Sequence, residues 1–227
     1  MPIHKDVVLA DGVVLQIATS ESSGLSPYYS IHAEENAKGK ATIEKWATLV
    51  NKINLWTYQA NFSNYLYFGD SFELFNEEGY KFFADNKVNA WVNQNSNGME
   101  TSWALLKEYI SSKLMWDTSV DLEEIYDNYF NAVYGTASVA MRNLFDMQRE
   151  AFQDALASYA TANPGLSAAG YANIFNGYYD DEKLKAITDG YKTVLDTVEV
   201  GSYAYYQIIK EAISPYFIAL TNRDRHD

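Results

Sequence analysis

Along the first 117 residues, short runs of β-branched and aromatic residues alternate with longer runs whose apolar residues recur every three or four positions. The short runs predict strands at 13–17, 53–58 and 88–92. The longer runs predict helices at 34–50 (chiefly its second half), 72–86 and 101–117. An apolar run at 7–9 is compatible either with a hairpin or with an irregular arm before the first strand. Three consecutive strand–helix units predict a parallel sheet, because parallel neighbours need a crossover helix between them.

Every long apolar pattern after residue 117 has the period of a helix. The predicted helices are 119–134, 138–160, 180–201 and 202–220. Pro215 is expected to kink the last of them. Amphipathic helices joined by short or moderate loops predict an up-down bundle packed on the sheet. We therefore expect two domains, a partial (β/α) barrel at 1–117 and an α-helical bundle at 118–227.

The stretch 105–117 lies where the two patterns meet. It is predicted to be the last barrel helix, capped by Thr101 or Ser102. The residues expected to face the sheet are Leu105, Leu106, Tyr109, Ile110 and Leu114. Trp116 is expected to begin the contact with the bundle, so that both halves share one core. On that expectation, Trp116→Ala destabilises the chain by roughly 3–5 kcal/mol.

Three strand–helix units are too few for a closed barrel, which takes eight. The open edges of such a sheet can pair with further strands or with a second copy. We therefore expect the chain to be the C-terminal part of a TIM-like barrel with an appended bundle, and its open sheet edges to allow self-association. The fold class is α/β followed by α.

Composition excludes several classes of function. The formal charge of −13, without a basic run, opposes binding to nucleic acid. No apolar run approaches the roughly 20 residues of a membrane helix. The absence of cysteine excludes disulfides and thiolate chemistry but leaves the compartment open. The three histidines lack metal-ligand spacing, and no phosphate-cradling glycine loop occurs, so no metal or cofactor is expected.

Aromatic and amide side chains follow the predicted strands. Active sites of (β/α) barrels lie at the C-terminal ends of the strands. Trp56 and Tyr58 offer flat faces for stacking on sugars. Hydrogen-bonding edges are offered by Gln59, Asn61, Asn93, Gln94 and Asn95. The pattern favours a neutral, hydroxyl-rich ligand such as an oligo- or polysaccharide, although Asn and Ser are also the ordinary residues of turns.

The carboxylates near the predicted strand ends do not form a convincing catalytic pair. Glycoside hydrolysis needs two carboxyl groups roughly 5–10 Å apart. Glu21 reads as an exposed residue of a serine-rich loop, Asp70 as a solvated loop residue, and Glu100 as a charge at a helix N-terminus. We therefore predict no hydrolysis by this polypeptide alone, and the catalytic residues stay unknown.

Several motifs resemble domain-of-unknown-function family 4838, a group of bacterial glycoside-hydrolase-like proteins. The stretch 105–117, followed by Tyr129-Phe130 and 134–137, is similar to the family pattern L-x-x-Y-x-x-x-K/R-L-x-W-D/N … F … Y-Y-G-x-A, and 53–58 is similar to its W-x-Y strand. The resemblance covers about residues 10–160. The resemblance implies a barrel like those of α-glucuronidases and β-hexosaminidases. The three strand–helix units of this chain would be the sixth to eighth units of that barrel. The resemblance also implies export, polysaccharide use, and a catalytic acid on about the fourth strand, outside this chain.

Two functions remain open at this point. The chain contributes carbohydrate contacts to a glycoside-hydrolase-like parent, or it is a non-catalytic carbohydrate-binding or protein-interaction scaffold. Loss of glycan binding on Trp56→Ala would favour sugar recognition over scaffolding.

Overall fold

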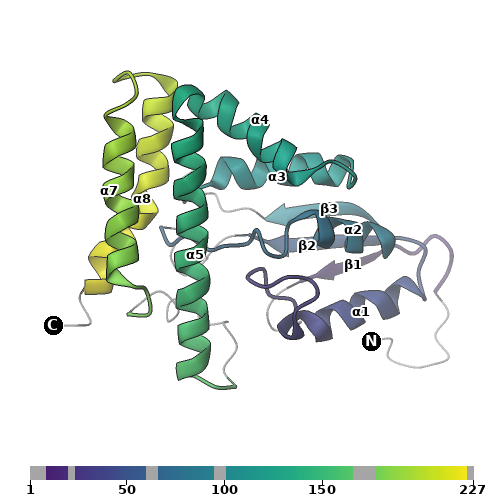
Figure 1. The fold of residues 1–227 in the computed structure, drawn as a ribbon. Helices are drawn as coiled ribbons and strands as arrows, with labels where there is room; N and C mark the ends of the chain where they lie inside the picture. Colours follow the sequence, from purple (N-terminus) through teal and green to yellow (C-terminus); the bar gives the residue numbers. More distant parts are fainter. Residues whose placement is uncertain (1–8, 20–23, 60–65, 95–100, 166–176, 224–227) are drawn as a thin grey trace. The chain divides into compact units, whose positions relative to one another are not determined.

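The computed structural model describes residues 9–19, 24–59, 66–94, 101–165 and 177–223 (Figure 1). The chain forms two compact units. Unit 1 comprises residues 1–59, 71–95 and 111–121, and unit 2 comprises 60–70, 96–110 and 122–227. The division therefore does not fall at a single boundary near residue 117, because two segments from the first half of the sequence belong with the helices of the second half.

Unit 1 contains the predicted parallel sheet. Its strands, in the spatial order β1-β2-β3, are β1 (Leu15–Ala18), β2 (Ile53–Tyr58) and β3 (Val88–Gln94). Both pairings are parallel, with Ile17 beside Leu55 and Leu55 beside Trp91. The prediction of three strands in a parallel sheet is confirmed.

The two faces of this sheet differ in burial. On β2, Ile53, Leu55 and Thr57 are buried, whereas Asn54, Trp56 and Tyr58 on the opposite face are only partly covered. Right-handed crossovers in a sheet of this order place both connections on one face. Strands of parallel sheets are usually covered on both faces, so the partly exposed face of this sheet is unusual.

The helices of unit 1 begin later than their apolar patterns suggest. They are the 3₁₀ turn η2 (Glu34–Asn36), α1 (Ala37–Ala47), α2 (Glu77–Asp85) and the second half of α3 (Ala104–Trp116). The predicted start of α2 at residue 72 is wrong. Asn76 is the N-cap, and its side chain accepts a hydrogen bond from the Gly79 N–H at 3.0 Å. Phe72 and Phe75 are buried in the preceding turns.

A buried asparagine organises the loop between β1 and η2. Asn36 is fully buried, and its amide nitrogen donates to the carbonyl oxygens of Ser26, Tyr29 and Ser30 at 2.9–3.1 Å. Its Oδ1 accepts from the Ser26 N–H at 2.6 Å. The loop therefore has a defined path, because one side chain satisfies backbone groups that no strand or helix pairs.

Unit 2 is helical, as predicted. Its elements are the first half of α3, α4 (Leu122–Tyr134), the 3₁₀ turn η3 (Gly135–Ala137), α5 (Ser138–Ala162), α7 (Asp181–Leu195) and α8 (Tyr203–Arg223). Helix α4 packs on α5, α5 packs on α7, and α7 packs on α8. Helix α8 in turn packs on α4. This closed sequence of neighbours is that of a four-helix bundle. Its core is rich in aromatic rings, with Phe130 and Phe145 at its centre.

The tryptophan that anchors α3 is not the predicted one. Trp116 is 92% exposed, so the expectation that it joins a shared core is wrong. Trp103, which precedes the first turn of α3, is fully buried in unit 2, 5.1 Å from Phe145 and 5.8 Å from Phe130 between ring centroids. Among the residues predicted to be covered, Leu106, Ile110 and Leu114 are buried.

Candidate functional site

The open face of the sheet carries aromatic and amide side chains. Trp56 and Tyr58 alternate along β2, and the register sets Val92 beside Trp56 and Gln94 beside Tyr58 on β3. The Trp56 Nε1–H donates to Gln94 Oε1 at 3.1 Å, which fixes the orientation of the indole across the two strands. Val92 is 50% exposed on the same face. We call Trp56, Tyr58, Val92 and Gln94 the aromatic face.

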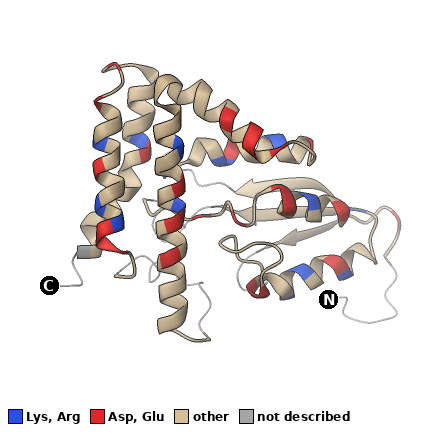
Figure 2. Cartoon of the chain, in the orientation of Figure 1, with Lys and Arg blue, Asp and Glu red and all other residues tan. Residues whose placement is uncertain are grey.

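The aromatic face carries no formal charge. The strands contain no Lys, Arg, Asp or Glu, whereas the helices around them do (Figure 2). Stacking surfaces beside an amide, without a carboxylate or a cation, suit a neutral ligand rather than an ionic one.

Two other predicted site residues point into unit 1. Thr57 donates its hydroxyl hydrogen to Asn93 Oδ1 at 3.0 Å and accepts from Trp91 Nε1 at 2.7 Å. The Asn93 and Gln59 amide nitrogens both reach the Ser111 Oγ of α3, at 3.3 and 3.5 Å. Gln59 is only 3% exposed. These amides tie the ends of β2 and β3 to α3, so the structure assigns them an internal role rather than a place on the aromatic face.

The remaining predicted site residues lie outside the described part of the chain. These are Asn61 and Asn95 among the ligand candidates, and Glu21 and Glu100 among the carboxylates. Of the predicted site residues, the structure therefore brings Trp56, Tyr58 and Gln94 together on one face of the sheet.

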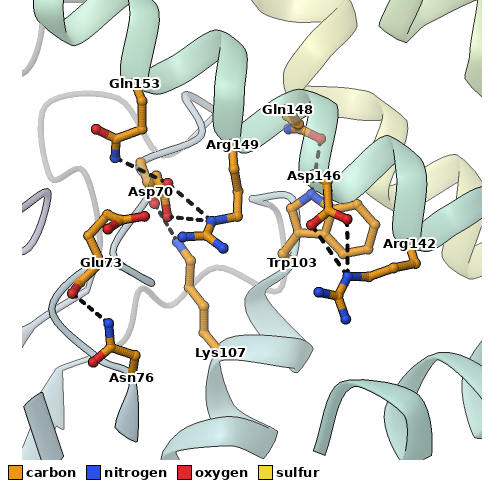
Figure 3. A network of polar contacts seen from close by, with 11 residues as sticks. Asp70, Glu73, Asn76, Trp103, Lys107, Arg142, Asp146, Gln148, Arg149 and Gln153 are labelled. Carbon is orange, nitrogen blue, oxygen red and sulfur yellow. Dashed lines mark hydrogen bonds and ion pairs between the residues drawn. The ribbon is translucent and has the colours of Figure 1, made fainter. Parts of the chain in front are cut away.

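Asp70 was expected to be a solvated loop residue, and that interpretation is wrong. Its side chain is fully buried in unit 2 and pairs with Arg149 Nε at 3.2 Å (Figure 3). Gln153 Nε2 donates to the same carboxylate at 3.2 Å. Because all three groups lie in unit 2, the pair fixes the segment 66–70 to α5.

A buried lysine lies close to this pair. Lys107 of α3 is 3% exposed, and its Nζ donates to the Gly69 carbonyl oxygen at 2.9 Å. Burial lowers the pKa of Lys107 to about 8, although the negative charges of Asp70 and Glu211 oppose that shift. The ammonium therefore supports the same segment that Asp70 holds.

A second buried carboxylate lies on α8. Glu211 is 1% exposed and accepts hydrogen bonds from the Trp103 N–H and from Tyr134 Oη. Burial raises its pKa to about 7, while the Trp103 hydrogen bond and the charges of Lys210 and Lys107 act in the opposite direction. Trp103 has a φ of 65°, a conformation that non-glycine residues seldom adopt. Gln148 Oε1 accepts from its indole N–H at 3.0 Å.

The charged groups of these unit 2 networks are hydrogen-bonded to other groups of the protein. The Asp70 carboxylate and the Lys107 ammonium are each engaged by neighbouring protein groups and lie away from solvent. Such an arrangement fixes loops and helices but offers no open position for a substrate. The sequence pattern does not single out Lys107 or Glu211. Each has a charged residue beside it, Glu108 and Lys210 respectively, as is usual on a solvent-facing helix surface.

In the described ranges, no group of three His, Cys, Asp or Glu side chains could hold a metal ion. No helix within them is long and apolar enough to cross a membrane.

Comparison with known proteins gives one relationship. No curated protein and no solved structure matches the chain. The family model described as "Domain of unknown function (DUF4838)" matches residues 5–146, which is more than half of the 227 residues. The chain therefore belongs to the DUF4838 family.

Proposed function

We propose that this chain supplies a carbohydrate-binding surface, the aromatic face of its sheet, to a glycoside-hydrolase-like protein. The observation that carries the proposal is the position of Trp56 and Tyr58 on one partly exposed face, with Gln94 hydrogen-bonded to the Trp56 indole. Sugars present apolar C–H faces and polar hydroxyl edges, which aromatic rings and amides complement. The absence of formal charge on these strands favours a neutral glycan.

The proposal includes a binding role without hydrolysis. Across the three strands, the residues of the open face are Gln16, Ala18, Asn54, Trp56, Tyr58, Ala90, Val92 and Gln94. None of them is a carboxylic acid, and hydrolysis of a glycosidic bond needs two. Asp70, a carboxylate that follows β2 in sequence, is engaged with Arg149. Turnover of aryl glycosides by the purified chain would contradict this part of the proposal.

The same face supports a proposal about the parent fold. A parallel sheet with its crossovers on one face and an exposed opposite face is what a section of a (β/α) barrel presents. In that arrangement the aromatic face lines the barrel interior near the C-terminal ends of the strands. The edge strands β1 and β3 would then pair with further barrel strands rather than with a second copy.

The test is glycan binding by matched tryptophan variants. Wild-type chain is screened on an array of neutral and uronic-acid-containing oligosaccharides, and hits are titrated by calorimetry. We expect Trp56→Ala to weaken binding at least about tenfold. Trp116→Ala removes a more exposed indole from the end of α3 and should leave binding unchanged.

The outcomes separate the candidate functions. Equal losses in the two variants would indicate nonspecific adhesion of sugars to exposed indoles. Absence of binding to every glycan would overturn the proposal and favour the alternative, a protein-interaction scaffold. Preferential binding of uronic-acid sugars would contradict the inference from charge.

A further inference from the structure

Helix α8 presents an apolar surface to solvent. Between Tyr203 and Asn222, every exposed residue is large and apolar or aromatic. These residues are Tyr203, Tyr206, Ile209, Ile213, Tyr216 and Leu220, which we call the α8 ridge. They recur at intervals of three or four and therefore form one stripe along the helix. At 1.5 Å per residue the stripe is about 26 Å long.

Helix α8 differs from an ordinary surface helix, whose polar residues face solvent. Its buried side includes Glu211, Ser214 and Asn222, in addition to apolar residues. Asn222 Nδ2 donates to the Tyr179 carbonyl oxygen at 3.2 Å, and Ser214 Oγ accepts from the Ser102 N–H at 3.1 Å. These bonds fix the rotation of the helix, so the ridge cannot turn inward without breaking them.

We infer that the α8 ridge is a self-association surface, and that a second copy of this chain covers it with its own α8 ridge. A ridge that packs on an identical ridge forms an isologous contact about a two-fold axis, the commonest arrangement of soluble homo-oligomers. The two helices run antiparallel, and Ile213 lies close to the middle of the contact.

Charge indicates where on its surface this chain could contact a second copy. With a formal charge of −13, two copies repel each other over most of their surfaces. The ridge residues carry no formal charge, and the half-buried Lys210 is the nearest cation along the helix. Figure 2 shows α7 and α5 with charged residues along their length, in contrast to most of α8.

The exposed area is of the size that a dimer needs. The three tyrosines of the ridge are 37–61% exposed, the two isoleucines 38% and 42%, and Leu220 66%. These fractions correspond to on the order of 700 Å² per copy, close to the roughly 800 Å² that each partner buries in a standard interface. An isolated apolar patch of this size on a monomer would be at the upper end of what is usual.

The first experiment measures molar mass against concentration by sedimentation velocity. We expect wild-type chain to reach twice the monomer mass within the micromolar range. Tyr206→Glu with Ile213→Glu places two carboxylates on the ridge and should raise the dissociation constant at least about tenfold. The control Val139→Glu places the same charge at a 73% exposed site on α5 and should leave the dimer intact. Circular dichroism and thermal melting confirm that each variant is folded.

The second experiment uses the absence of native cysteine. A single Ile213→Cys variant should form an intermolecular disulfide under mild oxidation, since the two copies of this residue lie near the two-fold axis. Val139→Cys should remain largely uncrosslinked. Monomeric wild-type chain at every concentration, dimers that persist in the double glutamate variant, or equal crosslinking of both cysteine variants would each overturn the inference.

Discussion

The hydroxyl of Ser102 donates a hydrogen bond to the carbonyl oxygen of Glu211, the carbonyl that Pro215 leaves without its helical partner. In a continuous helix the N–H of residue 215 would bond to that oxygen, but proline has no N–H. The segment before α3 thus fills a gap that the sequence of α8 creates. Ser102 N–H also donates to Ser214 Oγ, so two bonds attach this segment at the proline.

The first prediction concerns the coupling of Ser102 and Pro215. Ser102→Ala should destabilise the chain by about 1–3 kcal/mol, because it leaves the buried Glu211 carbonyl unpaired. In a Pro215→Ala background the loss should be smaller, since the restored N–H can bond to that carbonyl. Urea unfolding of the four chains in a double-mutant cycle should give a coupling of about 1 kcal/mol.

Ser158→Ala, at an exposed position on α5, is the control and should change stability by less than about 0.5 kcal/mol. Strictly additive effects of Ser102→Ala and Pro215→Ala would contradict the proposed relationship.

The second prediction concerns pH. The folded chain raises the pKa of Glu211 to about 7 from an ordinary value of 4.5, so the folded state holds this proton more tightly than the unfolded state. Its contribution to stability is fully present below about pH 4.5 and is lost as the pH rises through about 7. The loss is on the order of 3 kcal/mol.

Glu211→Gln should remove this loss, because glutamine stays neutral and its oxygen can still accept from the Trp103 N–H. The difference in unfolding free energy between variant and wild type should therefore shift in favour of the variant from pH 5 to pH 7.5. This range lies below the pKa of about 8 for Lys107. Glu199→Gln, at an exposed site, should follow the wild-type profile. If the unfolding free energies of Glu211→Gln and wild type changed in parallel with pH, burial would not raise the pKa of Glu211.

The third prediction distinguishes two tryptophans. Trp103→Ala should destabilise the chain by about 3–5 kcal/mol, since it removes a fully buried ring from a cluster with Phe130 and Phe145. Trp116→Ala should change stability by less than about 0.5 kcal/mol, because the side chain is 92% exposed. Thermal unfolding of both variants measures the two changes in stability. A large loss of stability in Trp116→Ala alone would support the expectation of a core shared through Trp116.

These contrasts show which features local sequence could indicate. Local sequence indicates the strands, because β-branched and aromatic runs such as 53–58 have few alternatives to a buried strand. The tryptophan pattern was ambiguous, because Trp103 and Trp116 lie at opposite ends of one helix and periodicity does not say which end is covered. Trp103 is held by residues 27 to 108 positions later in the chain, from Phe130 to Glu211, beyond the reach of any local pattern.

Burial of polar residues was the least predictable feature. Asp70 resembles an ordinary loop aspartate, and its partner Arg149 lies 79 residues further on. Of the candidate site, the strand period placed Trp56 and Tyr58 on one face. The inward hydrogen bonds of Gln59 and Asn93 depend on Ser111 of α3, a contact that the strand pattern does not contain.

The last prediction concerns Gly79 in the first turn of α2. Alanine is normally favoured over glycine inside a helix by about 1 kcal/mol. Here the Cβ of an alanine would lie 1.8 Å from the carbonyl oxygen of Leu74, so the backbone of the preceding turn would have to move. Gly79→Ala should therefore destabilise unit 1 by at least about 2 kcal/mol, the reverse of the ordinary effect. Gly12→Ala, with no atom within 4 Å of the added carbon, should be close to neutral. Chemical denaturation followed by far-ultraviolet circular dichroism measures both, and a stabilised Gly79→Ala chain would mean that the turn before α2 is looser than the structure has it.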